Sequence, residues 1–562
     1  MEALKSILTA TLFCYVFVMA VVGDWDSQTL FYDWTISMSQ RQVLGVKKQV
    51  ILVNNQFPGP ILNATTNDIV NINIHNNLTD PFLLTWNGVQ LRRNSWQDGV
   101  QGTNCPIMPG QSWTYSFEIK DQIGSFFYFP SILLHKAAGG YGAIRVNNRT
   151  AVPLPFPTPD GDFDVLIGDW FNSDYKYLRS LLDEGDNLPA PDGILINGLG
   201  PYQSVFRFET GATYRLRISN VGLKTSLNFR IQDHLLLLVE TEGSYTRKQY
   251  LSSLDVHVGQ SYSVLVTAKN QSGDKSFYMV ASSRFTSKEL FGIGIVRYPD
   301  SKSNPSGSLP SGPPLYDYIY SITQARTIRW DLAVGAARVD PQGSYRYGSI
   351  KESGTLILQS GVMFDGNRVR YTINGMSYVN PDTPLSLADL LHVKNVYQTG
   401  LIPEKPIGNL VPGLGTPVID VIHRSFYHIV FENSLSKLQT WHLDGYNLFV
   451  VGMGFGKWEE SSRKTYNLID AVPRSTVQVC PYSWTATLVM LDNPGIWNLR
   501  SQDAESWYLG QELYIRVKDF SVAKPNPSIP GKDEALPPPA NVILCGRAYL
   551  ENEASSHEKV ED

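Results

Sequence analysis

The chain has no run of basic residues and, beyond its N-terminus, no long apolar stretch. Its 47 lysines and arginines are outnumbered by 52 aspartates and glutamates, which gives a formal net charge of -5 at pH 7. That balance argues against nucleic acid as a partner. No later segment is long and apolar enough to predict a membrane span. The C-terminal sequence SSHEKVED is charged, so the apolar tail of a lipid-anchor signal is also not expected.

The N-terminus carries the one long apolar run. Lys5 precedes an apolar stretch from Ile7 to Val22, and small or polar residues follow it. This pattern predicts a secretory signal peptide over residues 1–23, with cleavage near Gly23. A membrane anchor is the alternative, but the run is short for a span of about 20 residues. We therefore expect a secreted, extracellular protein.

Cysteine is scarce. Cleavage of the signal peptide would remove Cys14 and leave Cys105, Cys480 and Cys545. In an oxidising compartment, three cysteines form at most one internal bridge and leave one free thiol. Secretion also makes the Asn-x-Ser/Thr sequons candidate glycosylation sites, and these lie at Asn63, Asn77, Asn148 and Asn270.

Turn-forming and aromatic residues are abundant, with 45 glycines, 34 prolines and 12% aromatic residues. Apolar and polar residues alternate in segments such as VNINIHNNL (residues 70–78) and TYRLRISNV (213–221), as in half-buried strands. Such strands, separated by glycine, asparagine and proline, predict an all-β protein built from sandwiches.

Proline-rich links divide the chain at residues 152–162 and 301–314. The predicted segments are 24–151, 160–300 and 315–523, followed by a Pro-rich tail over 524–562. Short helices are expected at residues 180–184 and 384–391.

Long motifs in a fixed order cover nearly all of the mature chain. They include VNNQFPGPIL, WQDG, NCPIMPGQSWTYSF and GGYGAI in the first segment, DVLIGDWF and GILINGLGPY in the second, and YTINGMSYVNPDTPL, TWHLDGYNLFVVG and NPGIWNLRS in the third. In these motifs the chain resembles the plant multicopper oxidases, and within them the ascorbate oxidase homologues of the SKU-like and pollen-specific subgroup. The resemblance implies three tandem cupredoxin-like Greek-key β-sandwich domains, in agreement with the three segments.

The same resemblance implies a demanding metal chemistry. Multicopper oxidases take electrons at a blue-copper centre, bound by one thiolate and two imidazoles, and deliver them to a three-copper cluster bound by eight imidazoles. This chain has 9 histidines in total, one of them His557 in the charged tail, where the family uses ten. The complete set of copper ligands is therefore impossible by count alone.

The four copper motifs also lack their ligands position by position. The first two correspond to Thr85-Trp86-Asn87-Gly88 and Tyr128-Phe129-Pro130-Ser131, and Ser501 replaces the blue-copper cysteine. Among the eleven ligand positions only His442 is retained; the others hold Thr85, Asn87, Phe129, Ser131, Gln439, Asp444, Arg500, Ser501, Gln502 and Ser506. We interpret His442 as a hydrogen-bonded core histidine, because one imidazole cannot hold copper tightly.

The lost imidazoles leave space that other side chains must fill. Phe129 is expected to supply apolar volume. We predict that Arg500 pairs with Asp444, because a buried guanidinium needs a carboxylate and further acceptors. The neighbouring polar side chains expected to complete the hydrogen bonds are Gln502, Thr85 and Asn87. The alternative is that one or both charged side chains turn outward.

The resemblance also implies a bridge between Cys105 and Cys545 that joins the first domain to the C-terminal tail. Cys480 lies in an alternating strand, where a buried, inert thiol is expected rather than a reactive one. His423 and His428 lie five residues apart around another alternating strand, and this odd offset argues against a shared metal site.

The predicted function is that of a copper-free, non-catalytic glycoprotein of the plant cell wall. The resemblance, and nothing in the spacing, implies a role in directional or pollen-tube growth, with cell-wall polymer or another secreted protein as partner. The alternative is an ascorbate oxidase-like, copper-dependent oxidoreductase with a reduced copper complement, and no cofactor is expected otherwise. A metal-independent enzyme finds no Ser-His-Asp or paired-carboxylate motif in support.

Overall fold

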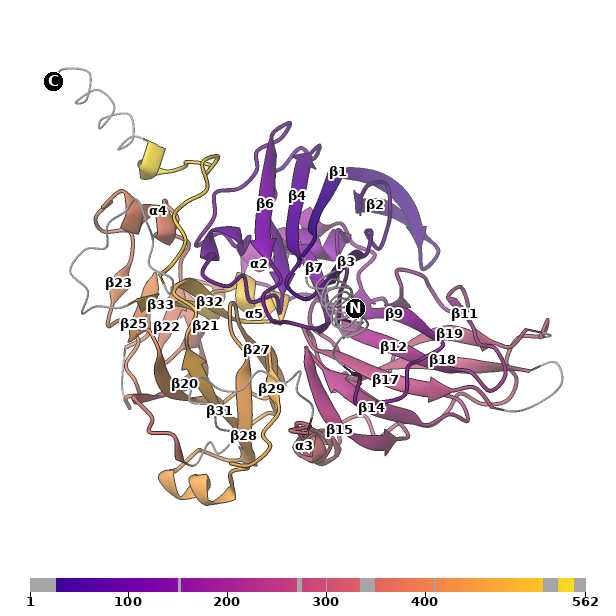
Figure 1. The fold of residues 1–562 in the computed structure, drawn as a ribbon. Helices are drawn as coiled ribbons and strands as arrows, with labels where there is room; N and C mark the ends of the chain where they lie inside the picture. Colours follow the sequence, from indigo (N-terminus) through magenta and orange to yellow (C-terminus); the bar gives the residue numbers. More distant parts are fainter. Residues whose placement is uncertain are drawn as a thin grey trace, which may run out of the picture.

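A computed structural model describes residues 27–149, 153–269, 275–299, 301–333, 349–408, 411–518 and 534–549. The predicted signal peptide, the sequon at Asn270 and parts of the Pro-rich tail lie outside these ranges. Strands dominate the described residues and form six sheets, two in each successive part of the chain (Figure 1). Neighbouring strands are often not consecutive in sequence, so the chain crosses between the two sheets of each pair.

The first pair of sheets holds the predicted alternating strand at residues 70–78. Val70, Ile72 and Ile74 are fully buried, and their cluster includes Trp34 and Tyr128, whose ring centres lie 4.7 Å apart. One sheet has the order β2-β1-β4-β6, from β1 (Thr29–Val43), β2 (Val46–Val53), β4 (Ile69–Asn76) and β6 (Ser112–Glu118). The other has the order β3-β8-β7-β5, from β3 (Leu62–Thr65), β5 (Leu84–Asn87), β7 (Gly124–Pro130) and β8 (Gly142–Asn147).

The second pair of sheets encloses its own apolar core, with Leu216 and Ile218 fully buried as their alternation predicts. Its larger sheet, of order β10-β9-β12-β17-β14-β15, contains β9 (Gly161–Trp170), β10 (Gly193–Ile196), β12 (Thr213–Asn220), β14 (Leu236–Thr241), β15 (Ser244–Leu251) and β17 (Ser261–Thr267). The other, of order β11-β19-β18-β13-β16, contains β11 (Val205–Arg207), β13 (Ser226–Ile231), β16 (Leu254–Val256), β18 (Ser276–Arg284) and β19 (Phe291–Arg297).

The third pair is the largest. The sheet of order β24-β22-β21-β20-β26-β31-β28-β29 contains β20 (Gly354–Asp365), β21 (Arg368–Ile373), β22 (Met376–Tyr378), β24 (Gly413–Gly415), β26 (Ser425–Asn433), β28 (Leu448–Phe455), β29 (Pro473–Arg474) and β31 (Ser483–Leu491). The sheet of order β23-β25-β33-β32-β27-β30 contains β23 (Gln398–Thr399), β25 (Pro417–Ile422), β27 (Gln439–Leu443), β30 (Thr476–Val479), β32 (Gly495–Ser501) and β33 (Glu512–Lys518).

Helices are short and lie in the connections. They are α2 (Tyr175–Glu184), α3 (Tyr318–Thr327), α4 (Leu385–Leu390) and α5 (Ala504–Tyr508), with 3-10 turns η1 (Ser95–Gln97), η2 (His135–Ala138) and η4 (Glu460–Thr465). The helix expected at 180–184 is the second half of α2, which begins earlier because Asp174 caps it by accepting a hydrogen bond from the Lys176 amide at 2.8 Å. Across the described residues, none of the helices combines the length and apolarity that crossing a membrane requires.

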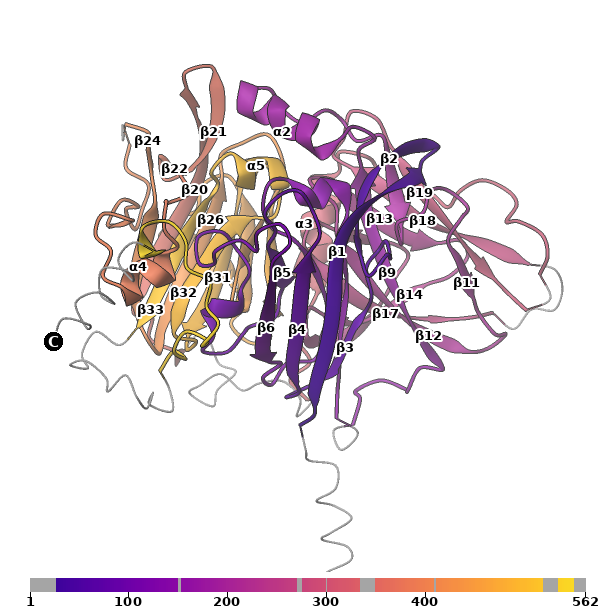
Figure 2. The ribbon, with the colours of Figure 1, turned by 90° about the horizontal axis from the view of Figure 1, so that it is seen from above.

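The first pair of sheets contacts both of the others and lies between them when the molecule is seen from above (Figure 2). Figure 1 shows it at the top, with the third pair to its lower left and the second pair to its lower right. One apolar cluster contains side chains from both the first and the third pairs, including Trp86 and Trp497. The copper-motif positions lie along this shared face.

Candidate functional site

Strands from the first and third pairs of sheets bring the copper-motif positions together. Thr85 of β5 lies opposite Phe129 of β7, and His442 of β27 lies opposite Arg500 of β32. All eleven positions are buried except Ser131, which is half-buried. The arrangement is therefore an enclosed group of side chains at the meeting of two sandwiches.

A guanidinium occupies a position that, by the family resemblance, would face the three-copper cluster. Arg500 is fully buried, and its Nη1 donates hydrogen bonds to Oδ2 of Asp444 and, at 3.0 Å, to Oδ1 of Asn498. Its guanidinium carbon lies 4.7 Å from the ring centre of Trp507, in a cation–π contact. The predicted Arg500–Asp444 ion pair is confirmed.

The predicted hydrogen bonds around this pair are wrong in their partners. Gln502 donates from Nε2 to Oδ1 of Asn87 at 2.5 Å, and Asn87 donates from Nδ2 to the Gly259 carbonyl at 3.1 Å. Within the described structure, Arg500 has no hydrogen bond to Gln502, Asn87 or Thr85. Asn498 takes that role because it lies two residues before Arg500 on β32, on the same face of the strand.

His442 is a hydrogen-bonded core histidine, as predicted. Its Nε2 lies 2.9 Å from Oδ1 of Asp444, and its Nδ1 lies 3.2 Å from the Thr476 hydroxyl. Both ring nitrogens are therefore engaged, and both oxygens of Asp444 have a partner.

Two neighbouring carboxyl groups have pKa values shifted in opposite directions. Burial alone would raise the pKa of Asp444, but Arg500 and His442 outweigh it and lower that pKa. Burial, and then the charge of Asp444, raise the pKa of Asp98 well above its usual value. Asp98 accepts a hydrogen bond from the Thr103 hydroxyl. One carboxylate thus balances one guanidinium, while burial and the Asp444 charge disfavour the ionised form of Asp98.

A lysine lies against the blue-copper positions. The Lys437 ammonium donates a hydrogen bond to the Ser506 hydroxyl at 2.7 Å and lies 3.6 Å from Oδ2 of Asp503. Burial by itself would lower the pKa of Lys437, but Asp503, Tyr371 and Glu505 outweigh it and raise that pKa. Lys437 is therefore a charged ammonium in contact with a position where the family has an imidazole.

Copper does not fit these residues. The one imidazole is bonded at both nitrogens, Ser501 supplies no thiolate, and the cations Arg500 and Lys437 lie at the two former centres. Among the described residues, no three histidine, cysteine, aspartate or glutamate side chains are grouped so as to hold a metal ion.

Sequence reasoning did not identify Lys437, Asn498, Trp507 or Asp98 as parts of this site. A signal for one of them was present, because Asn498 precedes Arg500 by two residues on β32, whereas Lys437 lies before β27 begins at Gln439. Residues two apart on a strand share a face. Trp507 and Asp98 lie on α5 and in a loop, where no such period applies.

The remaining predicted residues lie apart from this site. The Cys105–Cys545 disulfide is present with a Cα–Cα distance of 5.9 Å, and Cys480 is a buried free cysteine whose pKa burial raises to about 12. His428 contacts Tyr466 at 2.9 Å, whereas His423 lies 3.3 Å from the carbonyl oxygen of Asp492. Of the sequons, Asn63 and Asn77 are exposed and Asn148 is half-buried.

Comparisons with known proteins cover most of the chain. Three family models described as multicopper oxidase match residues 35–151, 161–300 and 382–521. The monocopper oxidase-like protein SKU5 of Arabidopsis thaliana is 48% identical over 535 residues, covering 92% of this chain and 89% of that protein. An L-ascorbate oxidase homolog of Brassica napus is 45% identical and covers 94% of each chain.

Solved structures show the same fold at low identity. Fet3p, a multicopper oxidase that functions in iron import, superposes with a TM-score of 0.76 and 19% identity, covering 94% of this chain and 95% of that one. The laccase of Botrytis aclada gives a TM-score of 0.71 at 21% identity, covering 87% and 88%. The three pairs of sheets are thus three cupredoxin-like domains.

Proposed function

The chain belongs to the multicopper oxidase family, and we propose that it is a secreted member that binds no redox copper and acts as a non-catalytic binding protein. The observation that carries this proposal is the Arg500–Asp444 ion pair, buried where the sequence places the three-copper cluster. A metal ion there would face a fixed positive charge and would have one imidazole to bind it.

The ion pair also resists displacement. Removing one partner of a buried pair leaves an uncompensated charge and costs about 3–5 kcal/mol. Copper that displaced Arg500 from Asp444 would have to offset this cost with ligands that the site does not supply. The cavity of the family therefore serves here as a packed, charged core.

Secretion and a place in the plant cell wall are part of the proposal. The apolar run from Ile7 to Val22 and the sequons support a secreted glycoprotein, and the relatives described above are plant proteins. A role in directional or pollen-tube growth rests on the family resemblance alone. The partner would be a cell-wall polymer or another secreted protein.

One relative's name favours a second candidate. The Arabidopsis protein is called monocopper oxidase-like, which suggests an oxidoreductase with a reduced copper complement. In this chain a single copper would have to bind at His442, whose two nitrogens already contact Asp444 and Thr476.

Oxygen consumption separates the two candidates. The full chain would be secreted from copper-supplemented plant cells, with an active ascorbate oxidase prepared in parallel as a control. We expect no oxygen uptake above that of heat-denatured protein when ascorbate or a phenol is supplied. Sustained, copper-dependent uptake would establish the oxidoreductase instead.

The binding role and location need their own test. A fluorescent fusion of the full chain, viewed in plasmolysed plant cells, should remain with the wall, and the purified protein should be retained on isolated wall polysaccharide. Signal confined to the cell interior, or no retention on any wall fraction, would contradict this part of the proposal.

A further inference from the structure

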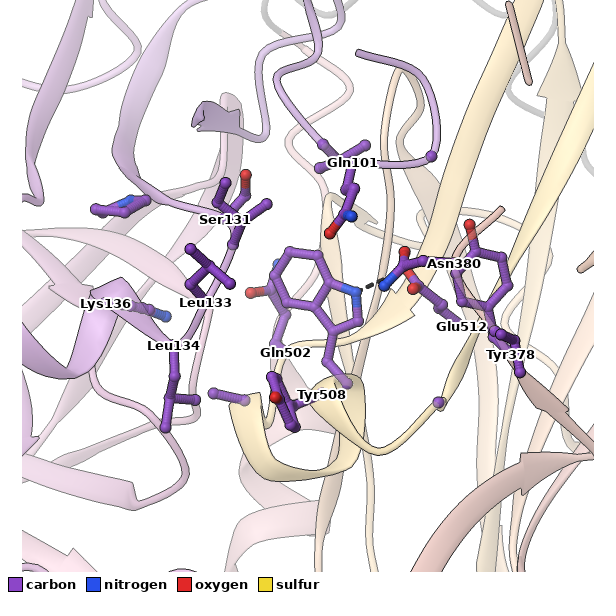
Figure 3. A pocket seen from close by; sticks show the side chains of 18 of the residues that line it. Gln101, Ser131, Leu133, Leu134, Lys136, Tyr378, Asn380, Gln502, Tyr508 and Glu512 are labelled. Atoms are coloured by element: carbon purple, nitrogen blue, oxygen red, sulfur yellow. Dashed lines mark hydrogen bonds between the residues drawn. The ribbon is translucent and has the colours of Figure 1, made fainter. Parts of the chain in front are cut away.

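A cavity of about 350 Å³ lies beside the Arg500–Trp507 contact, between the first and third domains (Figure 3). The first domain contributes residues 100–102, residues 129–134 and Lys136 to its lining. The third domain contributes residues of β21, β22, α5 and β33, and α2 contributes Asp183. Three side chains at former copper-motif positions, Phe129, Ser131 and Gln502, form part of the wall.

The cavity has an exposed mouth and a buried, charged floor. Gln101, Asp183 and Asn380 are exposed, whereas Lys136 and Glu512 are each 6% exposed. Figure 3 shows Lys136 and Glu512 on opposite sides of the cavity. Its size lies within the range of small-molecule sites, roughly 300–1,000 Å³.

The Lys136 ammonium has no anionic or hydrogen-bond partner among the described residues. Its Nζ lies 4.2 Å from the ring centre of Phe129, a cation–π contact that offsets only part of the cost of burying a charge. Burial lowers the pKa of Lys136 to about 7, in agreement with this lack of a partner. A buried ammonium that lines a cavity favours a negatively charged ligand.

The opposite wall combines an aromatic surface with a polar group. Trp507 donates from Nε1 to Oε2 of Glu512 at 2.6 Å, and this bond fixes the position of the indole. The Trp507 and Phe129 rings meet edge to face with centres 6.4 Å apart. Tyr378 and Tyr508 extend the aromatic lining.

We propose that this cavity binds a small planar organic carboxylate, with the carboxylate group at Lys136 and the flat body against Phe129 and Trp507. Arg370 also lines the cavity and is buried, but it donates hydrogen bonds to the Ser377 hydroxyl and the Tyr378 carbonyl. Aromatic walls and a buried ammonium without an acceptor suit a flat apolar body that carries one negative group. An inorganic anion would leave most of the volume unfilled. The site rests on the proposed absence of copper, because Phe129 and Gln502 contribute to its wall in place of ligands.

Benzoate is a suitable first probe for the full-length secreted protein. Its binding would be measured by saturation-transfer NMR and titration calorimetry, beside benzamide, which lacks the charge, and inorganic phosphate, which lacks the ring. We expect benzoate to bind at least tenfold more tightly than either. Comparable binding of benzamide would remove the role of Lys136, and comparable binding of phosphate would remove that of the aromatic walls.

Two variants and a control locate the site. Lys136→Met should weaken benzoate binding at least tenfold, and Asn380→Trp should do so by obstructing the mouth without changing the floor. Lys47→Met, at an exposed lysine of the first domain, should leave binding unchanged. Circular dichroism would confirm that each variant is folded. If Lys136→Met does not fold, Asn380→Trp still tests the site.

The outcomes separate this inference from the proposed function. No benzoate binding to copper-free wild-type protein, or equal binding by Lys136→Met and wild type, overturns the carboxylate site alone. Copper in the purified protein overturns the proposed function whatever benzoate does.

Discussion

At the residue scale, buried charges have specific partners, and their removal should have measurable costs. Arg500 has Asp444, Asn498 and Trp507 around it, whereas Lys136 has the Phe129 ring. The first cation is held in place by the fold, and the second is held without an acceptor. These two situations predict opposite effects on stability.

Arg500→Gln should destabilise the protein by about 3–5 kcal/mol, because it leaves the Asp444 carboxylate buried without its guanidinium and with His442 as its remaining partner. Urea unfolding, followed by tryptophan fluorescence, would measure the change. The double variant Arg500→Met with Asp444→Leu should recover most of the loss, since it removes both charges.

The loss of stability in Arg500→Gln should depend on pH. The pKa of Asp444 is lowered in the folded protein, so its stabilising contribution is present above the unfolded value of about 4 and is lost as pH falls below it. The difference between wild type and Arg500→Gln should therefore shrink under acid conditions. If the stability difference stayed constant from pH 7 to pH 3, the Arg500–Asp444 pair would not be its source.

Lys136→Met should stabilise the protein, because it removes a desolvated charge and no hydrogen bond. Around this lysine, Asp169 and Asp503 favour the charged form and Arg500 opposes it. Its folded pKa of about 7 lies below the unfolded value of about 10.4, so wild-type stability rises with pH between the two. The gain from Lys136→Met, read from thermal unfolding, should therefore be larger at pH 6 than at pH 9. If Lys136→Met lost stability at both pH values, the charge of Lys136 would stabilise the fold instead.

At the element scale, β27 and the β32–α5 connection retain the framework of a copper site without its donors. By the family resemblance, Ser501 and Ser506 stand at the cysteine and a histidine position of the blue-copper centre, and Gln439 stands at another copper-ligand position. Lys437 contacts Ser506. Whether the missing donors or the added ammonium excludes the metal can be tested by restoring ligands.

A triple variant with Gln439→His, Ser501→Cys and Ser506→His should show little blue absorption after copper loading while Lys437 remains. Adding Lys437→Leu to the triple variant should produce the thiolate–copper band, since it removes the competing cation. Absorption spectra of the two proteins, loaded with the same concentration of copper, would show whether Lys437 excludes the metal. Equal bands would show that Lys437 does not exclude the metal.

Elements of the fold were more predictable than contacts within the site. Alternation in β4 and β12 identified strands and their buried faces, because a period of two reports burial directly. The Arg500–Asp444 pair could be predicted because two opposite charges at buried positions have few other stable arrangements. The cavity at Lys136 could not be predicted, since it is formed by strands, loops and helices from distant parts of the chain, which no local pattern relates.

At the scale of the whole molecule, the C-terminal segment bridges the first and third domains. Cys545 is bonded to Cys105, and Trp113 donates a hydrogen bond to the Asn541 carbonyl at 3.1 Å. Arg547 pairs with Asp382 of the third domain at 2.8 Å. The segment therefore depends on one covalent link and several weaker contacts.

Replacing Cys105 and Cys545 by serine should release this segment and destabilise the fold by about 2–4 kcal/mol, because the bridge closes a loop with a sequence separation of 440 residues. Limited proteolysis followed by mass spectrometry should then show cleavage within residues 534–549, absent from wild type. Cys480→Ser, at a buried thiol outside the bridge, is the matched control. If the double variant resisted proteolysis as well as wild type, the noncovalent contacts would be enough to hold the segment in place.

Copper content per chain tests the central claim most directly. The secreted protein would be loaded with copper, passed over a metal-free desalting column and analysed by mass spectrometry of its metals. With Arg500 and Lys437 at the two former centres, we predict far less than one copper per chain, unchanged by longer loading. One or more tightly held copper ions per chain would contradict the account.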